Sequence, residues 1–380
     1  MTNAPESDAP AKRVLFLISD TGGGHRSAAQ AIVEALHLEY PGVFDAQVLD
    51  FLRSYYPSPL RYAPEIYPPM SKFPTWGLTY HALNGRGRAA IANDLSYPYL
   101  RRSMHRLLNE NPADLIVSVH PLANKTLPRA MRRHPRPFIT VVTDMVSTHA
   151  FWFDRHADLI VVPTDLARER AAHFGIPVGN IRVLGLPVAD QFCQPQPDLT
   201  AWRDEMDWPS TRPVALLVGG GDGMGPLKRV AKAINEAELP LSLVVVCGRN
   251  DELKADLEAV DWKIPARVVG FTRDMPKFMA ASDILITKAG PGTISEGFIS
   301  GLPLILYSRI AGQEEGNVDF VVDAGAGVWA PRPREVVDAL RTWTSDPDAM
   351  ARAAAVSASL ARPTASRDIA RVIAEQCGVA

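Results

Sequence analysis

Short apolar runs alternate with segments of helical periodicity along most of the chain. The first unit has an apolar run at residues 14–18, a helical pattern at 26–38 and a second apolar run at 46–51. This order predicts two parallel strands joined by a helix. The alternation continues in two further series of predicted strands, at residues 115–119, 138–142, 159–162 and 181–183, and at 214–218, 243–247, 266–269, 284–287 and 302–307.

The two series predict an α/β protein of two Rossmann-like, doubly wound domains that face one another across a cleft. A chain of 380 residues is also long for a single core. We expect a disordered start at residues 1–12, domains at 13–190 and 206–355, and a proline-rich linker at 191–205. We expect the C-terminal helix, within residues 356–380, to pack back on the first domain.

Residues 284–317 form the most informative stretch, which reads as strand, glycine-rich turn, helix, strand and loop. The turn opens the helix, so its free backbone N–H groups and the helix dipole suit a phosphate. Glu296 lies one turn into the helix, where it can accept hydrogen bonds from sugar hydroxyls. The other candidate binding residues are Gly290, Gly292 and Thr293 in the turn and Gln313, Glu314 and Asn317 in the final loop. The alternative is an ordinary tight turn followed by a surface loop.

A second glycine-rich loop follows the predicted strand at residues 214–218 and begins with Gly219, Gly220 and Gly221. Its backbone can wrap a diphosphate, or it can serve as a simple tight turn. Asp222 in the same loop disfavours an anion site unless its side chain points away.

His25 ends a third glycine loop, formed by Gly22, Gly23 and Gly24, and precedes a helix, so we expect it to project into the cleft. Helix N–H dipoles tend to keep such a histidine neutral, and a neutral imidazole can act as a general base. One alternative is the dinucleotide site of an oxidoreductase, with Asp50 on a ribose. The glycines are contiguous instead of spaced G-x-G-x-x-G, which disfavours that alternative. A purely structural histidine is the other alternative.

Asp144 follows a predicted strand and faces the same cleft, where it can orient a base or bind an acceptor. A helix-capping aspartate explains it equally well. His149 and Trp152 lie on the next loop, and core packing is the default for the tryptophan. His120 ends another strand, and we interpret it as a capping or packing residue.

The composition narrows the class of protein. A net charge of −2 gives no overall attraction to nucleic acid. Three widely spaced cysteines form neither a disulfide framework nor a metal-ligand pattern, and they favour a reducing compartment. The polar start has no signal-peptide core, and no apolar run approaches the ~18 residues of a spanning helix. Any membrane contact would therefore be peripheral.

The segment 52–100 is crowded with aromatic residues and prolines, and arginines are interleaved with them and follow as far as residue 106. Aromatic rings favour the interfacial layer of a bilayer, and basic side chains are attracted to anionic headgroups. A long structured insertion with an aromatic core is the alternative.

Four motifs together resemble the monogalactosyldiacylglycerol synthases. They are SDTGGGHRSAAQAI at 19–32, VVTDMVSTHAFWF at 141–153, VLGLPV at 183–188 and TKAGPGTISEGFISGLPLIL…IAGQEEGNV at 287–318. These enzymes are the lipid-galactosylating branch of a family that also includes diglucosyldiacylglycerol synthases and the glycosyltransferase that forms lipid II. The resemblance implies a GT-B fold, with a UDP-sugar in the second domain and a lipid acceptor at the first.

The resemblance also implies roles for particular residues. His25 would deprotonate the acceptor hydroxyl, and Glu296 would hold the ribose hydroxyls. The backbone around Phe271 and Thr272 would bind uracil. The diphosphate would lie against Gly219, Gly220, Gly221, Gly290, Gly292 and Thr293, and the hexose against Gln313, Glu314 and Asn317. Asp144 would act beside His25, and the acceptor would lie near Gly23, Gly24, His149 and Trp152.

The implied reaction is an inverting transfer of galactose from UDP-galactose to diacylglycerol. The sequence suits a metal-free route, and we expect neither a metal nor another cofactor. Residues 52–106 would contact anionic lipid, which implies a peripheral enzyme on the cytoplasmic face of a membrane. The alternatives are a UDP-glucose-dependent or processive enzyme, a UDP-sugar epimerase of the same fold, and a binding protein without turnover.

Overall fold

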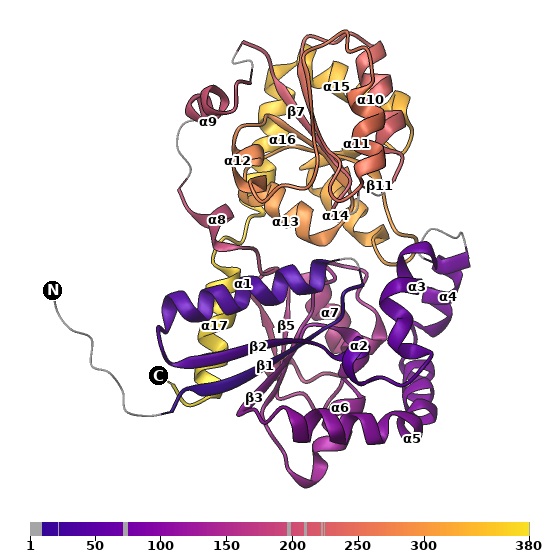
Figure 1. The fold of residues 1–380 in the computed structure, drawn as a ribbon, viewed down its shortest axis with the longest axis vertical. Coiled ribbons are helices and arrows are strands. Elements are labelled where there is room, and N and C mark those ends of the chain that lie inside the picture. The colour runs from indigo at the N-terminus through magenta and orange to yellow at the C-terminus, as the bar shows by residue number, and fades with distance from the viewer. Residues whose placement is uncertain are drawn as a thin grey trace, which may run out of the picture.

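The computed structural model describes residues 10–21, 23–70, 75–195, 199–208, 211–221, 223 and 225–379. The described residues form two six-stranded sheets with helices around them, and the strands of each sheet are all parallel (Figure 1). Helices cover both faces of each sheet. The predicted α/β class with two doubly wound domains is therefore confirmed. Gly22, Asp222 and the first nine residues, which entered the predictions above, lie outside the described residues.

The first sheet has the strand order β2-β1-β3-β4-β5-β6. The order reverses beside β1, because β2 lies on one side of this strand and β3 on the other. Ligands of open α/β sheets bind outside the carboxyl ends of the strands at such a reversal. The strands are β1 (Lys12–Ile18), β2 (Phe44–Asp50), β3 (Leu115–Ser118), β4 (Phe138–Val141), β5 (Leu159–Val162) and β6 (Ile181–Val183).

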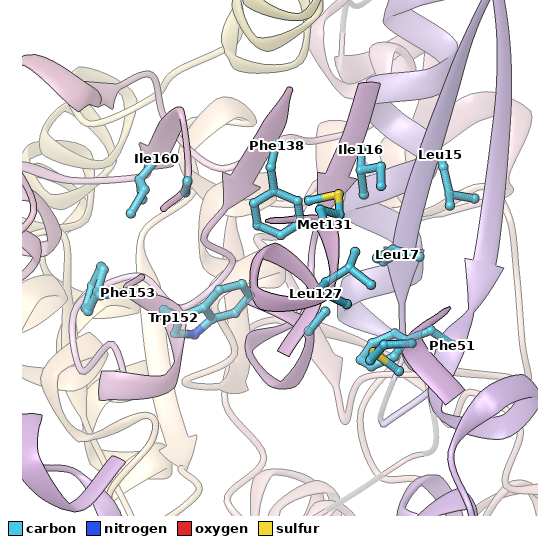
Figure 2. Packing of buried hydrophobic residues seen from close by; sticks show 14 of the residues in the cluster. Leu15, Leu17, Phe51, Ile116, Leu127, Met131, Phe138, Trp152, Phe153 and Ile160 are labelled. Carbon is cyan, nitrogen blue, oxygen red and sulfur yellow. The ribbon is translucent and has the colours of Figure 1, made fainter. Parts of the chain in front are cut away.

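Alternate side chains of β1 build two separate cores. Leu15 and Leu17 point into a cluster that includes Phe51, Phe138 and Trp152 (Figure 2). The intervening side chains of β1 point to the opposite face, beneath α1. The helices of this part of the chain are α1 (Gly24–Glu39), α2 (Phe51–Tyr55), α3 (Ala63–Met70), α4 (Thr75–Leu83), α5 (Arg86–Glu110), α6 (Thr126–Ala130) and α7 (Asp165–His173).

The aromatic segment between β2 and β3 is helical and forms α2 to α5. The side chains of α2 and the later part of α5 pack on the first sheet, whereas α3 and α4 extend toward the second domain (Figure 1). At Gly77 of α4 an added Cβ would lie only 3.0 Å from Cβ of Ala311. This close approach shows that the insertion touches the loop after β11.

The second sheet has the order β12-β11-β10-β7-β8-β9, which reverses between β7 and β10. The loops after these two strands carry the two glycine turns of the predicted donor site. The strands are β7 (Val214–Val218), β8 (Ser242–Val246), β9 (Ala266–Val269), β10 (Ile284–Lys288), β11 (Leu304–Ser308) and β12 (Gly327–Trp329). The short edge strand β12 was not predicted. The helices are α10 (Leu227–Glu236), α11 (Asp251–Glu258), α12 (Met275–Ala280), α13 (Pro291–Ile299), α14 (Glu315–Ala324) and α15 (Pro333–Ser345).

The chain passes between the domains twice. The first passage follows β6 and contains α8 (Asp190–Cys193) and α9 (Leu199–Glu205). The second connects α16 (Pro347–Ser359), which packs on the second domain, to α17 (Ala365–Gln376). Ile369 and Ile373 of α17 are fully buried in the core beneath α1, so the last helix belongs to the first domain's packing (Figure 1).

Candidate active site

His25 is the second residue of α1 and lies at the reversal point of the first sheet. Gly23, which precedes the helix, has φ +81°, a left-handed conformation that favours glycine. The Nδ1 atom of His25 lies 2.9 Å from Oγ1 of Thr143. The hydroxyl therefore fixes the direction of the imidazole, a role that the prediction gave to Asp144.

The imidazole of His25 is surrounded by other rings. The ring of His120 meets it edge-on at 4.7 Å between centroids, and the indole of Trp152 lies at 6.0 Å. Burial lowers the pKa of His25 to about 4, although the Val119 backbone carbonyl and Asp20 favour the charged form. His25 is therefore neutral near pH 7, as a general base must be.

His120 caps the 3₁₀ turn at Pro121–Ala123, which confirms its interpretation as a capping residue. Its Nδ1 accepts a hydrogen bond from the backbone N–H of Leu122, so its Nε2 carries the proton and faces Oγ1 of Thr21 at 3.4 Å. Burial and the neighbouring His25 hold the pKa of His120 well below its ordinary value.

Asp144 is buried and links the two domains. Its Oδ2 accepts a hydrogen bond of 2.6 Å from Nε1 of Trp152, and its Oδ1 accepts one of 3.4 Å from Nε2 of Gln313. Burial raises the pKa of Asp144 to about 6, and the two hydrogen bonds offset only part of this shift. Trp152 is fully buried, so we assign its side chain to holding this carboxylate and not to an open acceptor surface.

His149 is also buried, and both of its ring nitrogens have partners. Nδ1 accepts from the backbone N–H of Phe151, and Nε2 donates to the backbone carbonyl of Tyr80 at 3.3 Å. Burial lowers the pKa of His149 to about 4. The residue fastens α4 to the loop after β4, which differs from the predicted acceptor contact.

In the second domain the two glycine turns converge on Lys288, which the sequence patterns did not predict as a site residue. An added Cβ at Gly290 would lie 2.9 Å from Nζ of Lys288, and one at Gly220 would lie 3.5 Å from Cε of the same side chain. Nζ of Lys288 also pairs with Oε1 of Glu314 at 2.7 Å. A lysine directly before a glycine-rich turn is the only signal that the sequence offers for this residue.

Glu314 and Asn317 support this arrangement from within the protein. Oε2 of Glu314 accepts from the backbone N–H of Ile310, and the side chain is almost fully buried. Asn317 lies on α14 and is also buried; its Nδ2 donates to the carbonyl of Ala289 at 2.9 Å. Both side chains therefore hold the turn and the loop, in addition to any contact with a hexose.

Glu296 lies on α13, one turn beyond the start of the helix. Burial raises the pKa of its carboxyl to about 7. Within the part of the chain that the structure describes, this carboxylate has no hydrogen-bond or ionic partner. The residue is half-buried, and hydroxyl donors from a ligand would satisfy this partly desolvated carboxylate.

Phe271 and Thr272 follow β9 at the edge of the same site. The Phe271 ring is 56% exposed, and the guanidinium of Arg249 lies over it at 5.4 Å. The backbone N–H of Arg249 donates to the carbonyl of Gly221, so this pair adjoins the first glycine turn. The Thr272 hydroxyl accepts from the backbone N–H of Asp274. Binding of uracil by the backbone of this turn stays a prediction.

A pocket of about 200 Å³ lies between the domains, lined by residues that include Met145, Thr164 and Ser295. None of the predicted site residues lines it. Among the described residues, no group of three or more His, Cys, Asp or Glu side chains is arranged to hold a metal ion. Independence from metals stays a prediction.

The fold is that of the GT-B glycosyltransferases. The structure of MurG from Acinetobacter baumannii matches with a TM-score of 0.61 and 17% identity, over 96% of this chain and 99% of that one. The glycosyltransferase WaaG matches with a TM-score of 0.56 and 16% identity, over 95% and 99%. A UDP-GlcNAc 2-epimerase from Neisseria meningitidis also matches, with a TM-score of 0.60 and 12% identity over 96% and 100%. The fold alone therefore does not separate transferase from epimerase.

The sequence comparisons separate them. Residues 25–188 match the monogalactosyldiacylglycerol (MGDG) synthase family, and residues 214–366 match the glycosyltransferase family 28 C-terminal domain. Probable monogalactosyldiacylglycerol synthase 2, chloroplastic, of Oryza sativa subsp. japonica is 37% identical over 96% of this chain and 81% of its own length. Monogalactosyldiacylglycerol synthase 1, chloroplastic, of Arabidopsis thaliana is 36% identical over 90% and 66%. The chain belongs to the monogalactosyldiacylglycerol synthase family and is a glycosyltransferase, as the motifs predicted.

Proposed function

We propose that the protein transfers galactose from UDP-galactose to the free hydroxyl of diacylglycerol, with inversion at the anomeric carbon and His25 as the base. One observation carries this proposal. His25 contacts Thr143, and the next residue, Asp144, bonds Gln313 of the second domain. The base thus lies beside the loop that we expect to hold the donor sugar. Family membership supports the choice of substrates.

The donor half offers three features suited to a nucleoside diphosphate sugar. The N-terminus of α13 and the two glycine turns lie at the reversal point of the second sheet, which suits a diphosphate. Lys288 adds a positive charge between the turns. Glu296 presents an unpaired carboxylate for the ribose hydroxyls. A solved structure of MnaA from S. aureus carries UDP, and its fold matches this chain with a TM-score of 0.65 at 14% identity.

The proposed chemistry is a single displacement. The neutral imidazole of His25 takes the proton of the acceptor hydroxyl, and the oxygen forms a bond to C1 of the sugar. The bond between C1 and the phosphate oxygen breaks, and UDP leaves with the electron pair. Lys288 and the N–H groups of α13 stabilise the charge that develops on the diphosphate. Thr143 keeps the imidazole in the required direction.

The insertion offers an apolar surface for reaching a lipid acceptor. Among the described residues, six exposed aliphatic side chains lie on α3, α4 and α5: Ile66, Met70, Leu78, Leu83, Ile91 and Leu95. Leu78 is 73% exposed and Leu95 is 77% exposed. In the described part of the chain, no helix combines the length and the apolar character needed to cross a bilayer. We therefore propose peripheral attachment through this surface, with anionic lipid as the partner and the cytoplasmic face as the side.

The most specific part of the proposal is that the donor sugar is galactose and not glucose. Galactose and glucose differ only in the configuration at C4, so a few contacts from the loop at 310–317 decide between them. Transfer of glucose and addition of more than one sugar are the nearest alternatives. A UDP-sugar epimerase shares the fold, but it would need neither the lipid-facing surface nor an acceptor.

Incubating the protein with labelled UDP-galactose or UDP-glucose and diacylglycerol liposomes tests the proposal. We expect a β-linked monogalactolipid from the first donor and much less product from the second, with no need for added metal. A product made from UDP-glucose at the higher rate, or epimerised sugar without lipid, would overturn it. Liposome co-sedimentation of Leu78→Asp and Leu95→Asp, against wild type, tests the attachment surface, and both variants should bind more weakly.

A further inference from the structure

Tyr67 of α3 makes a contact that the proposed mechanism does not use. Its hydroxyl lies 2.6 Å from Oε1 of Gln313, although 246 residues separate the two in the sequence. The other end of the same amide, Nε2, lies 3.4 Å from Oδ1 of Asp144. Three separate segments of the chain therefore meet at the side chain of Gln313.

The chemistry of the two partners fixes which way the amide points. An ionised Asp144 only accepts hydrogen bonds, so the NH₂ group of Gln313 must face it. The amide oxygen then faces Tyr67, whose hydroxyl must donate. Burial raises the pKa of Tyr67, so its hydroxyl keeps the proton that this bond requires.

The surroundings hold Tyr67 in place against the loop. On α4, Gly77 packs on Ala311, and the ring of Tyr80 fills the space where Gly312 would carry a Cβ. The Nε2 atom of His81 lies 3.5 Å from Oε2 of Glu315. The insertion thus contacts residues on both sides of Gln313, which makes the position of Tyr67 relative to the loop well defined.

We propose that Tyr67 is a positioning residue for the donor sugar and that it acts through Gln313. This inference rests on the proposed function, in which Gln313 binds the hexose. The two contacts occupy one lone pair and one N–H of the amide, so one lone pair and one N–H are left to bind sugar hydroxyls in a fixed orientation. Without Tyr67 the amide can rotate, and donors that differ at a single hydroxyl are distinguished less well. Tyr67 itself touches no substrate.

Tyr67→Phe tests the inference, with Tyr40→Phe as the matched control. Tyr40 follows α1, outside the insertion, and its ring packs edge-on against Phe44 at 5.7 Å between centroids. A neutral hydrogen bond is worth about 0.5–1.5 kcal/mol, so we expect Tyr67→Phe to raise KM for UDP-galactose about 3- to 10-fold. The preference for UDP-galactose over UDP-glucose should fall by a similar factor. UDP has no hexose for Gln313 to bind, so the lost hydrogen bond should leave the affinity for UDP within about twofold of wild type.

A double-mutant cycle with Gln313→Ala separates positioning from a general loss of structure. If Tyr67 acts through Gln313, Tyr67→Phe has no further effect once the amide is removed. Additive effects of the two substitutions, an equal loss of UDP affinity, or a Tyr67→Phe variant as active as Tyr40→Phe would overturn the inference. Failure of the proposed function gives a different result, because wild type itself would then make no galactolipid.

Discussion

The two halves of the cleft have the same architecture but opposite chemistry. Each half lies where the strand order of a parallel sheet reverses. In the first half the strands β1 and β3 are followed by His25 and His120, two rings that burial keeps neutral. In the second half the strands β7 and β10 are followed by glycine turns around the charged Lys288. In the proposed mechanism, side chains at the reversal points, and not the shared fold, therefore assign the acid–base and leaving-group tasks.

The largest expected effect comes from removing the ring that defines the first half. His25→Ala should lower kcat by about 10²- to 10⁴-fold, which is the usual contribution of a general base. UDP affinity should hardly change, because the donor half is intact. Steady-state kinetics and UDP titration calorimetry measure the two quantities. His173→Ala, an exposed histidine on α7, is the control. A His25→Ala variant that keeps most of its rate would show that the first domain does not supply the general base through His25.

The next effect tests the charge of the second half. Lys288→Met alone would leave Glu314 buried without its partner and destabilise the domain. The double variant Lys288→Met with Glu314→Gln removes both charges. Hydrogen bonds to charged groups are worth about 1.5–3 kcal/mol, so UDP affinity of this variant should fall about 10- to 100-fold. Lys277→Met, which removes an exposed pair with Glu205, should leave UDP affinity unchanged. Unchanged affinity in the double variant would contradict a cationic donor half.

The third test uses pH. The pKa of Glu296 is raised to about 7, so its protonated form predominates below that value. If the ribose hydroxyls require the carboxylate, UDP affinity of wild type should fall about tenfold between pH 8 and pH 6. In Glu296→Gln the affinity should be low and independent of pH over the same range. A flat profile in wild type would remove Glu296 from the donor site.

The same carboxyl predicts an opposite effect on stability. Its folded pKa lies above its ordinary value of 4.5, so the folded protein binds more protons than the unfolded chain between about pH 4.5 and pH 7. The stability contribution therefore falls as pH rises through that window. Glu296→Gln should unfold at a higher temperature than wild type at pH 8, by an amount corresponding to at most about 3 kcal/mol. The difference should vanish near pH 4, as thermal unfolding at the two pH values would show.

The smallest effect sharpens the description of the first half. Thr143→Val removes the hydroxyl that orients His25 and keeps the shape of the side chain. One neutral hydrogen bond corresponds to about a 3- to 10-fold loss, which we expect in kcat and not in KM. Thr140→Val is a matched control, because the buried Thr140 hydroxyl has no hydrogen-bond partner among the residues that the structure describes. Equal activity of both variants would mean that other contacts orient the ring.

Local sequence patterns predicted the fold and the glycine turns because each depends on neighbours along the chain. The alternation of apolar runs with helical segments predicted the strands of both sheets except β12, which has three residues and lies at an edge. His25 was also predictable, since a loop after the first strand must open into the cleft. These features need no knowledge of which segments meet in space.

Contacts between distant segments could not be predicted in the same way. Thr143 looked like part of a strand end, and Tyr67 like one of many aromatic residues in the insertion. Lys288 looked like an ordinary end of a strand. The resemblance placed Trp152 and His149 near the acceptor, with core packing as the default for the tryptophan, and spacing in a loop does not say whether a side chain turns inward. Their roles depend on partners that lie far away in the sequence.

The two passages of the chain between the domains lie against each other. Gly185 of the first has φ +98°, and an added Cβ there would lie 2.6 Å from Cβ of Arg362 in the second. In Figure 1 these passages are at one end of the interface, and α3 and α4 are at the other. Because the two connections adjoin at one end of the interface, any opening of the cleft would rotate the domains about that end. The hydrogen bond from Tyr67 to Gln313 lies at the opposite end of the interface, so such an opening of the cleft would break it.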